Sequence, residues 1–587
     1  MARVISKGSI PDYLAYRPPL YPLLLGVIYM LFGDGALIPR LLQIFIGVIS
    51  CVLVQRIGSR LFGNVCGFFA GIIASITGLI VYFDLELLPT SLYIFLMLLM
   101  INEMLKIESG TGSALKAGIW FSLGCLCRPT LLTFFPIAVL WLWNGGTGKK
   151  KTGMFGIAVL AFLLFSTVSH IAIKSGPVIV SSQGGVNFFI GNNVESDGMT
   201  ARLPGFGAGW SWDTIESWAE AYKGKPLTPA AVDKVFWGLG FSEIQSDVGG
   251  FLNRTIRKAG LFWNRYEISS NRDLYYHGRS FPIIGFLMKL SFVLFLPFAL
   301  VGFFANLKSR NTKLIVYLLV VYYLSTLPFF VNARFRHPLT PFLIVGSMGA
   351  IQYLIKQFGK REYPKNLIVI IIAFFIGTIL PFSTSSGIDP ERWDYGLFTE
   401  GKALERSGRT AEAEQNYILA LEHNPRAPYV NYHLGELMRA RGNLNGAVNY
   451  FQQELEIQPQ FGKGWNELGV VQIDRGNQDK ALQCFERAVS VQPGLKEAAR
   501  NAARIYAYKG IAASEMEDWT HVYKNAKRAN DLEPTDPIYR VLLLESRFHM
   551  GDTVGISNEL ESLLKEFPSL PPVIELSALL HSKINSR

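Results

Sequence analysis

Long apolar stretches separated by short polar segments fill the first two thirds of the chain. Apolar runs of about the length of one bilayer crossing extend over residues 37–54, 66–83, 87–101, 155–173, 281–307, 314–331, 339–355 and 367–382. A further apolar run, residues 23–32, is too short to cross, which favours an interfacial or re-entrant helix. The pattern therefore predicts a polytopic α-helical membrane domain.

Residues 117–143 are apolar except for Arg128, which stands in the sequence Leu-Cys-Arg-Pro-Thr. One long crossing would place Lys116 and the Lys149–Lys151 cluster on opposite sides of the membrane, which the positive-inside rule disfavours. We therefore expect two short helices that meet at Arg128 and Pro129, with Arg128 at the opposite membrane surface. A single kinked helix with a snorkelling arginine is the alternative.

After Gly387 the pattern changes, and three blocks repeat at a spacing of 34 residues. The matched positions are small residues, aromatic residues and prolines: Gly401, Gly435 and Gly469; Gly408, Gly442 and Gly476; Ala413, Ala447 and Ala481; Tyr417, Phe451 and Phe485; Pro425, Pro459 and Pro493. They resemble the tetratricopeptide repeat, in which helix pairs stack into a solenoid. Looser fourth and fifth units end at Pro534 and Pro568. Such an array can bind a protein partner or serve only as a scaffold.

The composition fits a membrane part joined to a soluble part. The 587 residues are 50% hydrophobic and 17% charged, and the mean hydropathy is +0.26. This is too apolar for one soluble domain and too charged for a bare bundle of spans. The expected fold is mainly α, with a membrane domain over residues 1–388 and a repeat domain over residues 389–587. An extracytoplasmic loop is expected at about residues 174–280.

The net charge of +11 lies mainly in short loops between the apolar runs. This placement indicates membrane topology rather than nucleic-acid binding. If the basic loops are cytoplasmic, the long loop and the repeat domain lie on the outer face. We therefore expect an integral protein of a bacterial cytoplasmic membrane whose repeats are extracytoplasmic. The five cysteines show neither zinc-site nor disulfide spacing.

Two acids, Asp84 and Glu86, interrupt the apolar pattern in the sequence Tyr-Phe-Asp-Leu-Glu-Leu-Leu-Pro-Thr, residues 82–90. Acids this close to hydrocarbon are costly unless they meet a partner or a water-filled cavity. An ordinary polar loop at the interface is one interpretation. An active-site carboxylate at the membrane surface is the other.

Several short motifs occur in a characteristic order. They are Tyr-Arg-Pro-Pro-Leu-Tyr-Pro, Pro-Arg-Leu-Leu-Gln, Phe-Asp-Leu-Glu-Leu-Leu-Pro-Thr, Leu-Cys-Arg-Pro-Thr and Ala-Arg-Phe-Arg-His-Pro-Leu-Thr-Pro. Together they resemble GT-C type glycosyltransferases that use polyprenyl-phosphate sugars, including the dolichyl-phosphate-mannose protein mannosyltransferase-like and aminoarabinose-transferase-like families. The resemblance covers roughly residues 1–385. It implies an inverting transfer of a sugar from a lipid phosphate to an acceptor on the outer face of the membrane.

Under this resemblance the catalytic candidates are Glu86 and Asp84, because an acceptor hydroxyl or amine needs a carboxylate base. Glu86 is preferred, since it has the longer reach and lies toward the second helix. The same acids are also suited to holding a divalent cation against the phosphate. No other cofactor is expected.

A lipid-phosphate leaving group needs cations at the membrane surface, and arginine binds phosphate with two parallel hydrogen bonds. The substrate-binding candidates are Arg17, Arg128, Arg334, Arg336 and His337. Arginines at the ends of spans are also ordinary interface anchors.

The long outer loop carries the sequence Ser-Ser-Gln-Gly-Gly-Val-Asn-Phe-Phe-Ile-Gly-Asn-Asn, residues 181–193. Its asparagines Asn187, Asn192 and Asn193 fit a turn that binds sugar or acceptor. Glycine and asparagine also dominate turns with no ligand.

The expected partners are the membrane, a polyprenyl-phosphate-linked sugar donor, a protein or glycan acceptor and a protein bound by the repeats, without nucleic acid. Two alternatives stay open: a glycan transferase similar to an O-antigen ligase or polymerase, and a non-catalytic membrane-anchored scaffold. The scaffold gains weight from the start of the chain. Related enzymes begin with a membrane helix and a loop that carries the principal catalytic aspartate, and Met1 falls after that point. We therefore expect an upstream extension of about 20 apolar residues.

Overall fold

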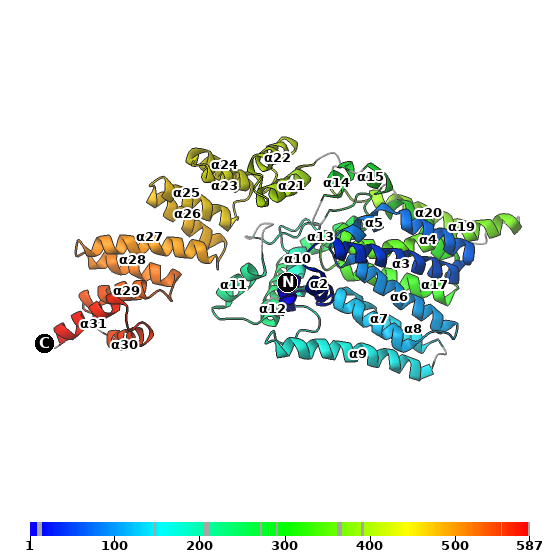
Figure 1. Ribbon diagram of the computed structural model, residues 1–587, viewed down its shortest axis with the longest axis horizontal. Helices are drawn as coiled ribbons and strands as arrows, with labels where there is room; N and C mark the ends of the chain where they lie inside the picture. Colours follow the sequence, from blue (N-terminus) through cyan, green and yellow to red (C-terminus); the bar gives the residue numbers. More distant parts are fainter. Residues whose placement is uncertain are drawn as a thin grey trace. The chain divides into compact units, whose positions relative to one another are not determined.

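The computed structural model describes residues 1–8, 14–145, 148–204, 211–269, 273–280, 282–288, 292–360, 367–388, 393–552 and 554–584. Over these residues the chain is helical and contains no strand (Figure 1), which confirms the predicted fold class. The chain forms two compact units. Unit 1 comprises Met1–Leu203, Pro226–Glu400 and Glu422–Asn424, and unit 2 comprises Pro204–Lys225, Gly401–Leu421 and Pro425–Arg587. The boundary expected after residue 388 stays a prediction.

Unit 1 contains the apolar helices. Within the described ranges, five apolar helical stretches are long enough to cross a membrane: Leu37–Phe62 (α3), Thr90–Glu108 (α6), Lys149–Ala172 in α9 (Gly148–Ala172), the stretch that contains Pro282–Met288 (α15) and Phe292–Ala305 (α16), and Ala333–Gln357. A sixth crossing results if Asn64–Ile76 (α4) and Gly78–Leu85 (α5), bent by 54°, form one broken span. The spans predicted at residues 314–331 and 367–382 correspond to shorter helices, Arg310–Thr326 (α17) and Leu367–Ile379 (α20).

Small residues allow close approach between the apolar helices. Helices α3 and α4 pack side by side (Figure 1). A Cβ atom added to Gly58 of α3 would stand 3.0 Å from the Cα atom of Gly67 in α4. Lipid tails are as apolar as leucine, so packing through small residues is a main source of helix association in membranes. Helix α3 continues to Phe62, beyond the apolar run 37–54. Arg56 and Arg60 therefore lie on this helix and not in a loop after that run.

The segment around Arg128 breaks where the sequence predicts. Ala114–Cys127 (α7) ends at Arg128, and Phe135–Trp143 (α8) begins after a short 3-10 turn. Pro129 opens this turn, because proline has no N–H with which to continue a helix. In the first turn of Leu20–Phe32 (α2), by contrast, Pro22 is accommodated, since N–H groups at that position have no helical partner.

The contacts of Arg310 show in which direction α8 runs. Its guanidinium donates a hydrogen bond to the carbonyl of Trp141 and pairs with Glu108 at the end of α6. The end of α8 therefore lies beside the end of α6, and α7 and α8 form a hairpin with Arg128 at the turn. A single kinked crossing would have carried Trp141 to the other side.

The long polar segment expected as a loop at about residues 174–280 is mostly helical in its described parts. Its helices are Gly184–Asn192 (α10), Trp212–Lys223 (α11), Pro229–Ser246 (α12), Val248–Trp263 (α13) and Leu274–Ser280 (α14). Thr228 and Asp247 cap α12 and α13, since their side chains accept backbone N–H groups of the first turns. The polar composition that predicts a loop reflects caps and solvent-facing helix sides.

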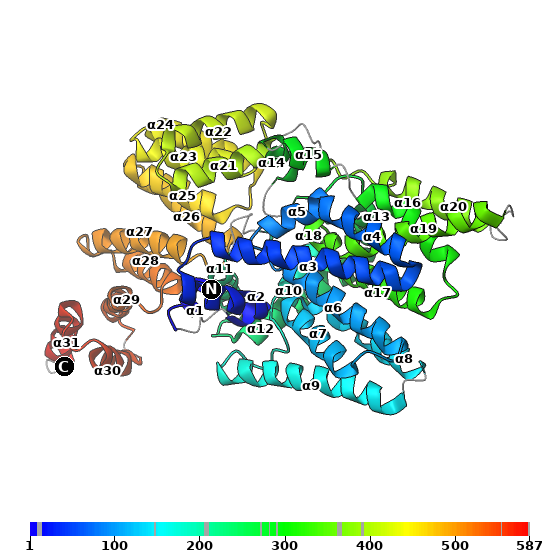
Figure 2. The same ribbon diagram turned by 45° about the vertical axis from the view of Figure 1, so that its right-hand side comes forward.

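Unit 2 holds the repeats, and the sequence period reappears in its packing. Successive helix pairs are α23 with α24 and α25 with α26 (Figure 2), over residues Val430–Ala440, Leu444–Ile457, Gly462–Asp474 and Gln478–Val491. A Cβ atom on Gly435 or Gly469 would lie 2.8 or 2.6 Å from the ring of Phe451 or Phe485. The small and aromatic residues that recur in the sequence therefore pack against each other between paired helices.

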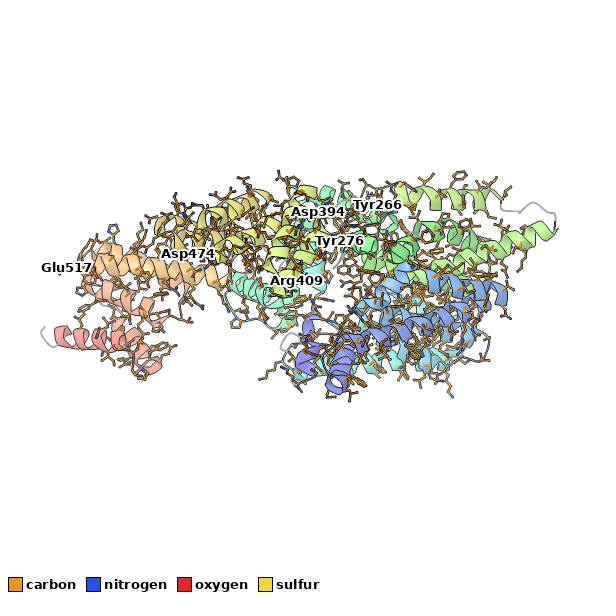
Figure 3. The ribbon with its side chains drawn as sticks, turned by 45° about the horizontal axis from the view of Figure 1, so that its top comes forward. Tyr266, Tyr276, Asp394, Arg409, Asp474 and Glu517 are labelled. Atoms are coloured by element: carbon orange, nitrogen blue, oxygen red, sulfur yellow. The ribbon has the colours of Figure 1, made fainter. Side chains whose placement is uncertain are left out.

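A second set of repeat glycines shares one backbone conformation. Gly408, Gly442 and Gly476 have φ of 80°, 77° and 77°, in the left-handed region that favours glycine. Arg439 of α23 bridges to the next repeat through Asp474, which is labelled in Figure 3, at 3.0 Å. The fourth repeat unit departs from the period of 34 residues because its first helix, Lys496–Ser514 (α27), has 19 residues where α25 has 13.

Candidate functional site

The two acids of unit 1 stand where α5 gives way to α6. Glu86 follows the last residue of α5 with extended backbone angles, φ −85° and ψ 131°. Pro89 immediately precedes α6, and the Ser91 hydroxyl donates to the Phe83 carbonyl at 3.0 Å. This "acid turn", residues 83–89, thus comprises the end of α5 and the link to α6.

Two polar residues of α3 hold the acid turn in place. Arg40 Nε donates to the Leu85 carbonyl at 3.1 Å, and Gln43 Nε2 donates to the Glu86 carbonyl at 2.7 Å. The Tyr21 hydroxyl donates in turn to Gln43 Oε1 at 2.8 Å. Arg40 and Gln43 belong to the Pro-Arg-Leu-Leu-Gln motif, whose positioning role the sequence analysis missed. The sequence feature that could have indicated this role is the order of the motif and the acid turn along the chain.

Asp84 and Glu86 have different surroundings. The Asp84 carboxylate lies against Gly47 of α3 so closely that any Cβ atom at position 47 would collide with it. Glu86 is half-buried, and its charge acts on Tyr21. Asp84 therefore packs into the helix bundle, whereas Glu86 lies beside the N-terminal segment.

The turn of the α7–α8 hairpin adjoins the acid turn. Cys127 Sγ lies 3.4 Å from the Pro89 carbonyl oxygen. The neighbouring Arg128 donates to the Arg334 carbonyl at 3.0 Å and to the Tyr322 hydroxyl at 3.1 Å. Segments about 40 and 200 residues apart in sequence are therefore neighbours at this point.

The segment that contains Arg334 reaches the acid turn directly as well. The His337 ring stacks on the Phe83 ring, with centroids 4.8 Å apart. His337 is 1% exposed, and its Nδ1 lies 3.3 Å from the Thr340 hydroxyl. This burial corrects the expectation that His337 contacts the donor, because it packs the acid turn instead.

Three of the predicted arginines form a cation cluster. Arg128 and Arg17 are the cationic side chains that act on Arg334. The Arg334 Nε atom is buried and has no hydrogen-bond partner. Across the described ranges, none of the three forms an ion pair with a carboxylate. Like charges so close repel each other, so the cluster is suited to an anion that bidentate arginines bind well.

Arg336 does not belong to this cluster. Its side chain is fully buried and pairs with Glu267 at 2.9 Å. It also donates to the carbonyls of Phe262, Asn264 and Tyr266 at 3.2, 2.7 and 2.7 Å (Tyr266 is labelled in Figure 3). The expectation that Arg336 binds phosphate is therefore corrected, because its donors are engaged within the protein.

Most of residues 181–193, the segment that fits a sugar- or acceptor-binding turn by sequence, is helix α10 (Gly184–Asn192). Asn192 is fully buried, and its amide donates to the carbonyls of Phe188 and Pro328 at 2.7 Å each. Asn193, 2% exposed, donates to backbone carbonyls of the same helix. The glycines serve close helix packing, and Asn192 and Asn193 are structural residues; Asn187, half-buried, lies on the same helix.

Lys258 is a buried cation that no sequence feature marked. Its Nζ donates to the Gly191 carbonyl at 3.0 Å and to Asn192 Oδ1 at 3.2 Å. Burial, and to a lesser extent the charge of Arg254, lower the pKa of Lys258 to about 8. The lysine therefore links α13 to α10 through Gly191 and Asn192.

Comparison with known families agrees with this geometry. Residues 16–171 match the family model described as dolichyl-phosphate-mannose-protein mannosyltransferase. The N-terminal region is therefore similar to this family over those residues. Residues 398–460 and 462–494 match tetratricopeptide repeat models, so the resemblance read from the motifs is confirmed. The mannosyltransferase-type match contains Arg17, Glu86 and Arg128, while Arg334 lies beyond it.

The solved structures with detectable similarity include tetratricopeptide proteins. YrrB, described as a TPR protein with an unusual peptide-binding site, is 15% identical, with a TM-score of 0.25, over 31% of this chain and 91% of that chain. MamA is 13% identical, with a TM-score of 0.23, over 29% and 88%. A thermophilic TPR protein of Thermus thermophilus is 20% identical, with a TM-score of 0.19, over 32% and 98%. No curated protein matches this chain.

Proposed function

We propose that this protein transfers a sugar from a polyprenyl-phosphate carrier to an acceptor on the outer face of the membrane. The observation that carries the proposal is the meeting of the acid turn with the cluster of Arg17, Arg128 and Arg334. A carboxylate and a set of cations without carboxylate partners are the two groups that such a transfer requires.

The reaction follows from these groups. An acceptor hydroxyl or amine attacks the anomeric carbon, and the bond from that carbon to the phosphate oxygen breaks. Glu86 takes the proton that the acceptor loses. The leaving phosphate gains negative charge, which Arg334 and Arg128 stabilise. The attack comes from the side opposite the leaving group, so the anomeric configuration inverts and no covalent sugar–enzyme intermediate is needed.

The acid turn offers a metal ion few ligands. Among the described residues, the acids are not joined by a third carboxylate, histidine or cysteine in a group that could hold an ion. Arg40 and Gln43 bind the backbone of this turn rather than its carboxylates. We therefore derive no step through a divalent cation, and the arginines supply the positive charge in this mechanism.

Replacing Arg334 by lysine is expected to raise the KM for the lipid-phosphate donor by about 10- to 100-fold, since one or more charged hydrogen bonds of about 1.5–3 kcal/mol are lost. A lysine ammonium keeps the charge but lacks the planar fork of donors. The measurement is transfer of radiolabelled sugar by purified protein in detergent at varied donor concentration. Arg265→Lys is the matched control, because Arg265 lies over the rings of Tyr266 and Phe382 and takes no part in the cluster. An unchanged donor KM in both Arg334→Lys and Arg334→Ala would reduce Arg334 to an interface anchor.

The repeats are proposed to lie on the same side of the membrane as the acid turn. The basic residues Arg310 and Lys149–Lys151 lie at the end of the helices that is opposite the acid turn. Glu108 lies at the same end. A cysteine at Met516, which is 80% exposed, should react with an impermeant maleimide in intact cells, or in spheroplasts if an outer membrane is present. A cysteine at Lys150 should react only after lysis. The reverse result would place the acid turn in the cytoplasm and remove the basis for outer-face transfer.

A further inference from the structure

Three side chains with metal-binding atoms meet within unit 2, away from the acid turn. Glu405 stands in the last turn of Asp394–Arg406 (α21), and His433 and Glu436 are one turn apart on α23. These are the first helices of two successive repeats. His433 Nδ1 lies 3.2 Å from Glu405 Oε2 and 3.1 Å from Glu436 Oε2. One ligand atom from each residue falls within 4.8 Å of the others.

These separations suit a small divalent ion. Zinc binds histidine nitrogen and carboxylate oxygen at about 2.0–2.2 Å in a tetrahedral arrangement, which places neighbouring ligand atoms roughly 3.3–3.5 Å apart. The two distances from Nδ1 are close to this value. The two carboxylate oxygens lie within 4.8 Å of each other. The side chains of His433, Glu405 and Glu436 are 16%, 28% and 34% exposed, which leaves room for the carboxylates to rotate to the shorter separation. That partial exposure also leaves room for water as a fourth ligand.

Further contacts orient the three residues. The Tyr417 hydroxyl donates to Glu405 Oε2 at 2.6 Å, and the Tyr432 hydroxyl donates to Glu436 Oε1 at 2.8 Å. The Tyr417 ring stacks on the His433 ring, with centroids 5.5 Å apart. Metal-binding side chains characteristically have such outer hydrogen-bond partners, which fix their orientation and raise their affinity. Tyr432 uses the carboxylate oxygen that faces away from His433, so the nearer oxygen keeps its ligand role.

We propose that Glu405, His433 and Glu436 bind a divalent transition-metal ion of the zinc type and that this ion fastens the first two repeats to each other. Two carboxylates and one neutral imidazole match the charge of such an ion. The site is independent of sugar transfer, because all its residues belong to the repeat unit.

The two carboxylates also change the proton affinity of His433. Burial works against a charged His433, but the neighbouring carboxylates of Glu405 and Glu436, which accept from the imidazole, outweigh it and raise its pKa. Lys402 is a further cation that acts on both carboxylates, and Glu454 is an additional acid near His433. Proton and metal therefore compete for the same nitrogen, as they do at histidine metal sites in general.

The test is a titration of the full chain, purified in detergent and stripped with a chelator, with Zn²⁺ alone in competition with a chromophoric zinc indicator. The wild type should bind one more equivalent than His433→Gln. Glu405→Gln and Glu436→Gln should each weaken that equivalent by about tenfold or more, and Tyr432→Phe should weaken it by less, because outer partners contribute about 10- to 100-fold. Asp84→Asn should leave the equivalent intact, which separates it from any ion at the acid turn.

His521→Gln is the matched control. His521 pairs with Asp518 at 2.7 Å on an exposed helix turn, and among the described residues this pair is not part of a three-residue metal-binding group. Circular dichroism of each variant verifies that the helices are retained. If a variant unfolds, the visible spectrum of the Co²⁺-loaded wild type still reports tetrahedral binding. Equal zinc stoichiometry and affinity in the wild type and a folded His433→Gln, or an octahedral Co²⁺ spectrum of the wild type, would overturn the proposal.

Discussion

Replacing Glu86 by glutamine is expected to lower the rate of sugar transfer by about 10²- to 10⁴-fold, the usual contribution of a general base. Glutamine keeps the size and the backbone contacts of the acid turn, in which Gln43 binds the carbonyl of residue 86 and not its side chain. Donor binding should therefore change little, because the arginine cluster is untouched. Steady-state kcat and donor KM of purified protein separate the two effects.

Asp84→Asn provides the comparison for this experiment. Asp84 packs against Gly47 of α3, so its carboxylate is less accessible to an acceptor than that of Glu86. We expect a smaller loss of kcat, accompanied by a lower melting temperature. Normal transfer by Glu86→Gln together with an inactive but folded Asp84→Asn would assign the base to Asp84. If both variants and Arg334→Ala equal the wild type in every transfer assay, the scaffold alternative is favoured.

Replacing Arg336 by methionine is expected to lower the free energy of unfolding by about 3–5 kcal/mol, the cost of removing one partner from a buried ion pair. Glu267, 6% exposed, would remain as a buried charge without its partner. Three backbone carbonyls, those of Phe262, Asn264 and Tyr266, would lose their donor as well. Thermal unfolding in detergent, followed by size-exclusion chromatography of the soluble fraction, measures this loss.

The double variant Arg336→Met with Glu267→Gln distinguishes a structural role from a donor-binding role. Removing both charges eliminates the uncompensated carboxylate, so the double variant should be more stable than Arg336→Met alone. Its donor KM should stay near that of the wild type. A folded Arg336→Met of normal stability with a raised donor KM would instead return Arg336 to the phosphate site.

The helices of this protein and much of their order follow from patterns that are local in the chain. Apolar runs of bilayer length predicted the helices of unit 1, and the break at Arg128 followed from Pro129. The period of 34 residues predicted the helix pairs of the repeats, within which Gly435 packs on Phe451. Each of these inferences depends on residues close together in the chain, whose spacing decides helix length, helix ends and the pairing of adjacent helices.

The roles of individual polar residues, by contrast, depend on the folded arrangement. Arg334 and Arg336 are two positions apart in one motif, yet the first joins a cation cluster and the second pairs with Glu267. The sequence around Asn192 predicted a sugar-binding turn, but this residue is held by Lys258. A side chain's role depends on partners from distant segments, and neither local periodicity nor residue type contains that information.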